Sequence, residues 1–257
     1  MPTEAPILFA CANDVATITL NRSDKRNALN EAMWLGLAEA VKRADALPDA
    51  KIIVIRGGGG HFAAGADISE FETVYASRER GTQYRRAVEN GARAITDATK
   101  PAIAMIEGSC IGGGMAIALA CDLRMASGTA KCGITPAKLG IVYSFGDTKR
   151  LVDVVGPSKA KDILFTGRIM DASEAQSIGL VDEVHAPDAL EKAVAAKCAL
   201  LANNSQWSIR GAKEMVRLIL SGAKEARETG DDAAGQADFR EGRTAFLEKR
   251  PPKFPYR

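Results

Sequence analysis

The stretch K-P-A-I-A-M-I-E-G-S-C-I-G-G-G-M-A-I-A-L-A-C-D, residues 100–122, decides the fold of this chain. Pro101 keeps the residue before it out of a helix, and the mostly apolar run 102–107 is short enough for a buried strand. A glycine-rich loop follows, and then the alanine-rich run 115–121, which is typical of a closely packed helix. This order brings unpaired backbone N–H groups and the positive end of a helix dipole to one point. We therefore predict that Gly112–Gly114 form half of a site that stabilises negative charge on a ligand oxygen.

The composition is that of an ordinary globular protein. Its 257 residues suit one domain with an appendage, and its 46% hydrophobic and 26% charged residues are typical of a globular protein. A net charge of +2 gives no reason to expect nucleic acid or an anionic membrane as partner. Five cysteines without a C-x-x-C pair favour a reducing compartment over a disulfide framework or a metal site. With no signal-like start and no 18-residue apolar run, we expect a cytoplasmic location and no membrane partner.

Strands and helices alternate over the first 185 residues, which predicts an α/β body. The elements expected before the central stretch are two strands over 7–20 that turn at Asn13-Asp14, a helix over 31–46 capped by Asn30, a strand over 52–55 and a helix over 68–97. A second glycine- and alanine-rich loop lies between the last two, and the absence of a following G-K-[ST] excludes a P-loop.

Helices dominate the rest of the chain. The expected elements are a strand over 123–126, a helix near Leu151 behind the capping pattern Ser144–Asp147, a helix from Pro157 to Thr166, a short helix ending at Gln176 and capped by Asp171 or Ser173, and a strand over 181–184. From Asp188 onward the pattern predicts helices, with breaks near Asn203-Asn204 and near Gly230. The chain therefore ends in a helical C-terminal region.

Four segments in order carry a family pattern. They are N-R-x-x-K-R-N-A-L-N at 21–30, F-A-A-G-A-D-I at 62–68, K-P-x-I-A-x-I-E-G-x-x-I-G-G-G at 100–114 and E-G-x-x-A-F-L-E-K-R at 241–250. Together they resemble the crotonase superfamily, also called the enoyl-CoA hydratase/isomerase family. The resemblance implies a spiral of ββα turns as the core, residues 1–195, with the CoA and oxyanion site. It also implies a helical region, residues 196–257, that forms trimers or dimers of trimers and lays its tail over CoA.

The same resemblance implies chemistry on acyl-CoA thioesters. The backbone N–H groups of Ala66 and Gly113 match the two donors that bind the thioester oxygen and stabilise an enolate. The positions that match the family's CoA contacts are Lys25, Ala28, Ala64, Asp67, Ile68, Phe246 and Lys249. Ordinary solvated charge is the alternative for Lys25 and Lys249. CoA enters as part of the substrate, and neither a permanently bound cofactor nor a metal is expected.

The chain departs from the family where the hydratases keep two glutamates. Ala116 stands two residues after the three glycines, and Pro136 stands at the second position by equal spacing between Gly133 and Gly140. A shifted alignment places Ala137 there instead. Methyl and pyrrolidine groups cannot transfer protons, so water addition by a pair of glutamates is not expected.

The pattern T-P-x-x-L-G-[IV]-x-Y, residues 135–143, resembles the methylmalonyl-CoA decarboxylase branch of the superfamily. The resemblance places Thr135 and Tyr143 at the reacting end of the substrate. Decarboxylation fits a site without a base, because loss of CO₂ depends on stabilisation of the enolate. That branch carries a histidine at the position of Ala66 and a glutamate at that of Ala116, so the exact reaction stays open.

Three further polar side chains are candidates for proton transfer. Tyr143 has a phenol that could donate or accept a proton, with a packed tyrosine as the alternative. Asp147 follows Ser144 in a capping pattern and has a structural role as its alternative. Glu89 lies twelve residues before Pro101, where some relatives place an active-site histidine, and a solvated helix face is its alternative. His61 and His185 match no site, and Cys110, Cys121 and Cys132 are expected to be buried as small hydrophobic residues.

The sequence thus predicts an acyl-CoA enzyme that works through a thioester enolate. Isomerase or decarboxylase-type chemistry is favoured, with a weak hydratase and a non-catalytic acyl-CoA binder as alternatives. RNA binding, known for a few family members, finds little support in a charge of +2 and 5% aromatic residues.

Overall fold

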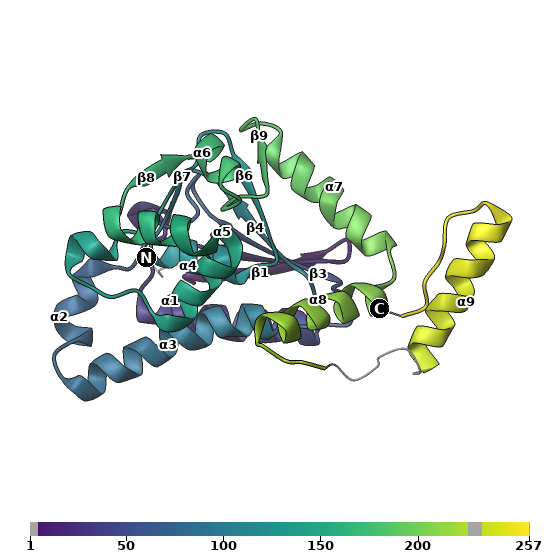
Figure 1. The fold of residues 1–257 in the computed structure, drawn as a ribbon, viewed down its shortest axis with the longest axis horizontal. Coiled ribbons are helices and arrows are strands. Elements are labelled where there is room, and N and C mark those ends of the chain that lie inside the picture. Colours follow the sequence, from purple (N-terminus) through teal and green to yellow (C-terminus); the bar gives the residue numbers. More distant parts are fainter. Residues whose placement is uncertain (1–4, 226–232, 257) are drawn as a thin grey trace.

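The computed structural model describes residues 5–225 and 233–256. Its main sheet has six strands in the order β1-β2-β3-β4-β6-β9 (Figure 1). Their bounds are β1 Ile7–Ala12, β2 Val15–Leu20, β3 Ile52–Gly57, β4 Ala102–Ile106, β6 Leu123–Ser127 and β9 Glu183–His185. The β1–β2 pair is antiparallel and the other pairs are parallel. Asn13 and Asp14 turn the hairpin with positive φ angles, as their side chains allow, which confirms the predicted turn.

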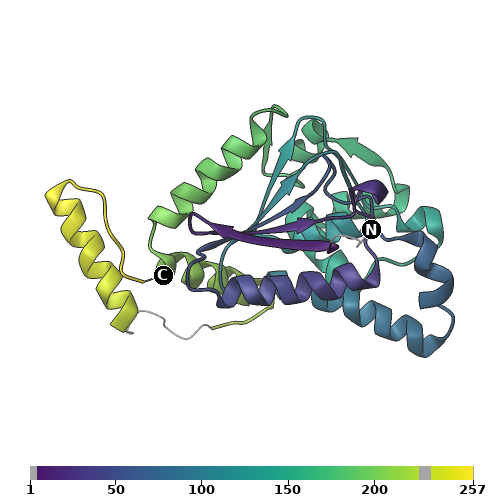
Figure 2. The ribbon, with the colours of Figure 1, turned by 180° about the vertical axis from the view of Figure 1, so that it is seen from behind.

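Both faces of the sheet are covered, which explains the uninterrupted apolar run of β3. Ile53 and Ile55 belong to the large core beneath α1 (Glu31–Ala46) and α4 (Gly113–Ala120), whereas Ile52 and Val54 pack on the opposite face with Leu190 and Val194 of α7 (Leu190–Asn203). Strands buried on two sides need no polar alternation. Figure 2 shows the β1–β2 hairpin at the edge of this sheet, with α1 running below it.

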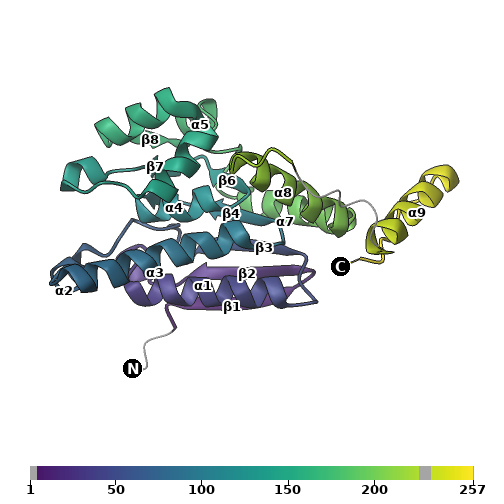
Figure 3. The same ribbon diagram turned by 60° about the horizontal axis from the view of Figure 1, so that its bottom comes forward.

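The predicted single helix over 68–97 is wrong. A short 3-10 turn at Ile68–Glu70 leads into α2, Phe71–Val74, and a separate α3 runs from Arg78 to Asp97. Ser77 separates them, because its extended backbone and its Oγ, which accepts the Arg80 N–H, make it the N-cap of α3. Helices α1 and α3 lie side by side (Figure 3), and α3 approaches closely at Gly91, where a Cβ would come within 2.7 Å of Trp34.

A second, three-stranded sheet was not expected from the sequence. Its strands β5 (Ser109–Ile111), β7 (Lys131–Gly133) and β8 (Ile169–Asp171) have three residues each, too few to show a period. Cys110 and Cys132 are paired in register on β5 and β7. Both thiols, like that of Cys121, are buried as predicted.

Helix α5, Phe145–Thr166, begins earlier than expected because Ser144 caps it directly. Gly156 has φ 75° and ψ 165° and breaks the helical path ahead of Pro157, so the two predicted helices are the two halves of α5. Asp171 rather than Ser173 caps the short helix α6, Ala172–Ser177. The strand predicted over 181–184 lies two residues further on, as β9.

The C-terminal helices are α8, Gln206–Leu220, and α9, Ala233–Glu248. The predicted break at Asn203-Asn204 is confirmed by the junction of α7 and α8, whereas the one near Gly230 falls outside the described residues. Helix α9 projects from the body and meets it at α8 (Figures 1 and 2). The expected boundary between the core, residues 1–195, and the helical C-terminal region falls inside α7, whose apolar side chains pack on the sheet. Within residues 5–225 and 233–256, no helix combines the length and apolar character that a membrane crossing requires.

Candidate active site

The glycine loop that follows β5 is fixed on both sides. Gly112 has φ 52° and ψ −108°, a conformation that favours glycine, and its N–H donates to the Gly133 carbonyl of β7 at 2.8 Å. Its own carbonyl accepts the Ala116 N–H at 2.9 Å, which begins the hydrogen bonding of α4. Gly113 is the first residue of α4, so its N–H lies at the positive end of the helix dipole.

Ala66 presents its N–H to the same place. Leu29 forms a parallel bridge with Ala66, in which the Leu29 N–H donates to Gly65 O at 2.7 Å and the Asp67 N–H donates to Leu29 O at 2.9 Å. Because successive N–H groups of an extended chain point to opposite sides, the Ala66 N–H points away from Leu29. A Cβ built on Gly113 would lie 3.8 Å from the Ala66 nitrogen. The two N–H groups therefore lie close together, and neither has an acceptor among the described residues.

Ala63 couples the two loops that carry these donors. Its N–H donates to Ser109 O at 2.8 Å, and its carbonyl accepts the Ile111 N–H at 2.9 Å. Helix α4 packs against this bridge so closely that a Cβ on Gly114 would come within 2.6 Å of the Ala63 oxygen. The spacing of the donors thus depends on backbone contacts between two loops.

Two polar residues that the sequence analysis did not single out hold the first family segment against the second. The Arg22 guanidinium pairs with Asp67 at 2.9 Å and donates to Ala28 O at 2.6 Å. The buried Asn27 side chain donates to Gly58 O and His61 O. The only sequence signal for these contacts is the turn-rich composition around Asn27, whose φ is 57°.

Asp67 is a carboxylate held in its ionised form. Hydrogen bonds from Ser69 and Arg22 lower its pKa despite its burial. The Asp67 side chain also caps the 3-10 turn at Ile68–Glu70. These partners account for the position of Asp67 without any ligand.

Tyr143 lies beside the glycine loop. Its hydroxyl donates to Gly112 O at 3.2 Å, so it helps to hold the loop that carries Gly113. Burial, and to a lesser extent the charge of Asp147, raises the pKa of the Tyr143 phenol well above its ordinary value. The phenol is therefore a donor near neutral pH and not a base.

Asp147 is buried and fully engaged. It accepts the Ser144 hydroxyl at 2.6 Å and an Arg150 N–H at 2.6 Å, and its own N–H donates to Ser144 Oγ. The predicted capping role is confirmed by the last of these contacts. His61 is also structural, because its Nδ1 accepts the Ser109 N–H at 3.1 Å.

The remaining candidates are not gathered at this point. Glu89 lies on the exposed side of α3, and Thr135 is half-buried just before the 3-10 turn Pro136–Leu139. Of the positions matched to CoA contacts, Lys25 and Ile68 are exposed near the two coupled loops. The Ala64 N–H donates to the carbonyl oxygen of Arg26, in the same short segment as Ala28. Phe246 lies in the last turn of α9 and Lys249 directly follows this helix, which projects from the body at the end opposite to α2 (Figure 1).

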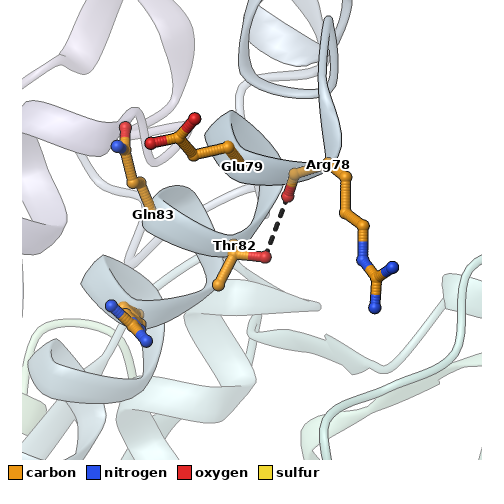
Figure 4. Close-up of a pocket in the computed structure, with 5 residues that line it drawn as sticks. Arg78, Glu79, Thr82 and Gln83 are labelled. Carbon is orange, nitrogen blue, oxygen red and sulfur yellow. Dashed lines mark hydrogen bonds between the residues drawn. The ribbon is translucent and has the colours of Figure 1, made fainter.

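Two open hollows on the surface lie away from the paired donors. One, of about 460 Å³, runs along the exposed side of α3 (Figure 4) and is lined by Arg78, Glu79, Thr82, Gln83 and Arg86. The other, of about 510 Å³, lies between the end of α3 and α8. Neither is lined by Ala66 or Gly113. Among the described residues, no group of three or more His, Cys, Asp or Glu side chains is placed to hold a metal ion.

Comparison with known proteins gives one consistent result. The model of the family described as enoyl-CoA hydratase/isomerase matches residues 11–257. A probable enoyl-CoA hydratase of Mycobacterium leprae is 36% identical over 95% of both chains, and a crotonyl-CoA hydratase of Syntrophomonas wolfei is 34% identical over 96% of this chain and 97% of its own. A solved structure from Hyphomonas neptunium, described as an enoyl-CoA hydratase/isomerase family protein, is 45% identical, covers 98% of both chains and superposes with a TM-score of 0.91.

The two sheets, the helices packed around them and the C-terminal helices define an α/β enzyme of the crotonase fold, as the sequence predicted. The chain belongs to the enoyl-CoA hydratase/isomerase family. This family acts on thioesters of CoA, so the expectation of an enzyme is confirmed at the level of the family.

Proposed function

We propose that this protein converts an acyl-CoA through a thioester enolate held by the backbone N–H groups of Ala66 and Gly113. The observation that carries the proposal is the pair of adjacent N–H groups, unpaired among the described residues, at the start of α4. Removal of a group next to a thioester leaves negative charge on its oxygen, which such fixed donors stabilise. One donor of this kind typically contributes about 10²–10³ in rate.

The reaction we favour is isomerisation or decarboxylation over hydration by paired glutamates. Ala116, two residues after the glycines, is buried among apolar side chains, and Pro136 stands at the start of a 3-10 turn. Neither can activate water. We assign the protonated phenol of Tyr143 either to proton donation or to holding the loop. Thr135 lies earlier in the same segment of the sequence. Asp147 lies near Tyr143, and its charge contributes to the raised pKa of the phenol. Glu89 is the weakest of the candidates, because its side chain is exposed.

For substrate binding we propose that Lys25, Ala28, Ala64, Asp67 and Ile68 surround the CoA moiety, since their segments are bonded to one another in the fold. Phe246 and Lys249 would then serve the site of a neighbouring copy, in a trimer or a dimer of trimers built through residues 196–257. Phe246 is 83% exposed and α9 projects from the body, both of which suit such a role.

A substrate screen tests the function. Purified protein is incubated with crotonyl-, 3-enoyl- and malonyl-type CoA esters, and the products are identified by mass spectrometry. We expect turnover of a 3-enoyl or malonyl-type ester to exceed hydration of crotonyl-CoA. Faster hydration of crotonyl-CoA would contradict the preferred reaction. Thermal stabilisation by acyl-CoA without any product would support the non-catalytic binder instead.

A further inference from the structure

The hollow between the end of α3 and α8 is a cavity that the proposed function does not use. Its volume of about 510 Å³ is within the range of pockets that hold small molecules. Residues 96–99, at and just after the end of α3, line one side, and α8 lines the other from Trp207 to Arg217. Tyr256 of the C-terminal tail lines it as well. The hollow is open to the surface, so a ligand can enter it.

Arg210 lines this hollow with hydrogen-bonding capacity to spare. Its Nη1 donates to the Tyr256 hydroxyl at 3.3 Å, and its guanidinium carbon lies 5.1 Å from the centre of the Tyr256 ring. Within residues 5–225 and 233–256, Nε is buried without a partner, and no acceptor binds Nη2. The half-buried guanidinium therefore keeps N–H groups, those of Nη2 above all, that a ligand in the hollow can use.

The other charged side chains that line the hollow are already neutralised. They belong to three ion pairs, Lys213–Asp122, Arg217–Glu214 and Arg93–Asp97, with N–O distances of 2.8, 2.7 and 3.0 Å. Arg210 has no carboxylate partner in the described part of the chain, so it supplies one positive charge in excess. A ligand with a single negative charge balances it, whereas a dianion such as phosphate would also meet the carboxylates of Asp97 and Glu214.

Lys100 adds positive charge near Arg210. It is 3% exposed, and its Nζ donates to Ala44 O at 2.8 Å and to Leu47 O at 2.6 Å. Burial lowers the pKa of its ammonium group, and the charge of Arg210 lowers it further, although Asp45 acts in the opposite direction. The two cations thus repel each other, and an anion bound at Arg210 would offset that repulsion.

The hollow also offers apolar surface for the body of a ligand. The half-buried Trp207 is fixed from the side of α9, because a Cβ on Gly235 would come within 2.7 Å of its ring. A Cβ on Gly211 would meet nothing within 4 Å, so the space above this residue of α8 is open. A flat apolar group can therefore lie along α8 at Gly211 and contact the indole of Trp207.

We propose that this hollow binds a small molecule with one carboxylate and a flat apolar body, the carboxylate ion-paired with Arg210 and the body lying against Trp207 and Gly211. The site does not include the paired donors, so the inference is independent of the proposed function. Its walls come from α3, α8 and the C-terminal tail, where the Tyr256 N–H donates to Asp238 of α9 at 3.1 Å. An occupied site therefore also holds the tail against the body.

Binding of four probes to the full-length protein tests the proposal. Calorimetry gives dissociation constants for 2-naphthoate, for 2-naphthamide, which has the same rings without the charge, for acetate, which has the charge without the rings, and for inorganic phosphate. We expect 2-naphthoate to bind about tenfold or more tightly than each of the other three, because only it combines the ion pair with the apolar contact.

Two variants then locate the binding site. Arg210→Gln removes the charge, and Gly211→Leu keeps the charge but places a side chain in the hollow, so each should weaken binding of 2-naphthoate about tenfold. The double variant Glu214→Gln/Arg217→Gln removes a complete ion pair from the same helix and is the matched control, with the affinity of the parent expected. Melting temperatures verify folding, and Gly211→Leu carries the test if Arg210→Gln does not fold.

The outcomes that overturn the proposal are distinct. A parent protein that binds no probe, or that binds 2-naphthoate and 2-naphthamide equally, has no carboxylate site here. Tighter binding of phosphate than of 2-naphthoate contradicts the ligand class. Affinity that survives in either folded variant, or that falls equally in the control, places the ligand elsewhere and removes Arg210 from the site.

Discussion

The hydroxyl of Tyr143 donates a hydrogen bond to the carbonyl oxygen of Gly112, the residue immediately before the proposed donor Gly113. The phenol thus contacts the backbone that precedes the proposed donor. Tyr143→Phe should lower kcat about tenfold with a small change in KM, because the loss of one hydrogen bond of about 1–1.5 kcal/mol loosens the loop. Steady-state kinetics on the best ester of the substrate screen measure this.

Asp147→Asn is the comparison for that variant. It replaces a buried partner of Ser144 and Arg150, so we expect it to lower the free energy of unfolding by about 1–3 kcal/mol. We expect its turnover to fall less than that of Tyr143→Phe. Parent-like turnover of Tyr143→Phe would refute the assignment.

Removal of the second donor should have the largest effect on rate. Ala66→Pro deletes an N–H that no acceptor among the described residues uses, so no backbone hydrogen bond is lost with it. We expect kcat to fall by about 10²–10³, as for other oxyanion donors. Ala66→Ser keeps the N–H and isolates the side-chain effect. If the proline variant, shown to be folded by circular dichroism, is as fast as the serine variant, the enolate proposal is wrong.

The contact between Gly114 and Ala63 predicts a steric effect on stability. Gly114→Ala brings a Cβ within 2.6 Å of a carbonyl oxygen that already accepts Ile111, so the loops must shift. We expect a loss of about 1–3 kcal/mol in urea unfolding. Gly211→Ala in α8 is the control, because a Cβ there meets nothing within 4 Å and should add about 0.5–1 kcal/mol through helix propensity.

The Arg22–Asp67 pair predicts a pH dependence of stability. Hydrogen bonds from Ser69 and Arg22 lower the pKa of Asp67 below its ordinary value of 3.8, so its contribution is present above that pH and is lost as the pH falls through the native pKa. Asp67→Asn should therefore be less stable than the parent near neutral pH, and the difference should shrink below pH 3.8. Urea unfolding between neutral and acidic pH measures it, and a difference that does not depend on pH would exclude this role.

Lys249 allows its charge to be tested apart from its backbone. It has φ 55°, a left-handed conformation that glycine adopts at no cost, so Lys249→Gly removes the ammonium without strain. If this side chain contacts the phosphates of CoA bound to a neighbouring copy, KM should rise about three- to tenfold, with the effect diminishing at high salt. Lys253→Ala, which removes an exposed lysine of the same tail, is the control. Equal KM values for both variants and the parent would remove Lys249 from the site.

Local signals predicted much of the fold. The Asn30 cap, the β-branched strand beginning at Ile52 and the glycine loop between β5 and α4 each depend on residues close in sequence, and each is confirmed. The order of the family segments also placed the crotonase fold correctly.

Long-range and very short features were beyond such reasoning. Three-residue strands such as Lys131–Gly133 form only because neighbouring strands pair with them. The Arg22–Asp67 pair joins residues 45 positions apart, and its sequence signal is only charge. The packing of Trp34 against Gly91 and Gly113 likewise joins residues that are far apart in the sequence.

The bridge between Ala63 and β5 has a consequence for how this enzyme could diversify. Because the proposed donors and the contacts that space them are peptide groups, we expect ordinary side-chain replacement at Ala66 or around Ala116 to leave the proposed anion site in place. The groups that we propose for proton transfer, in contrast, are side chains, Tyr143 foremost, and can be exchanged singly. Under the proposed function, the intermediate therefore depends on backbone groups, and its fate depends on side chains that can be replaced one at a time.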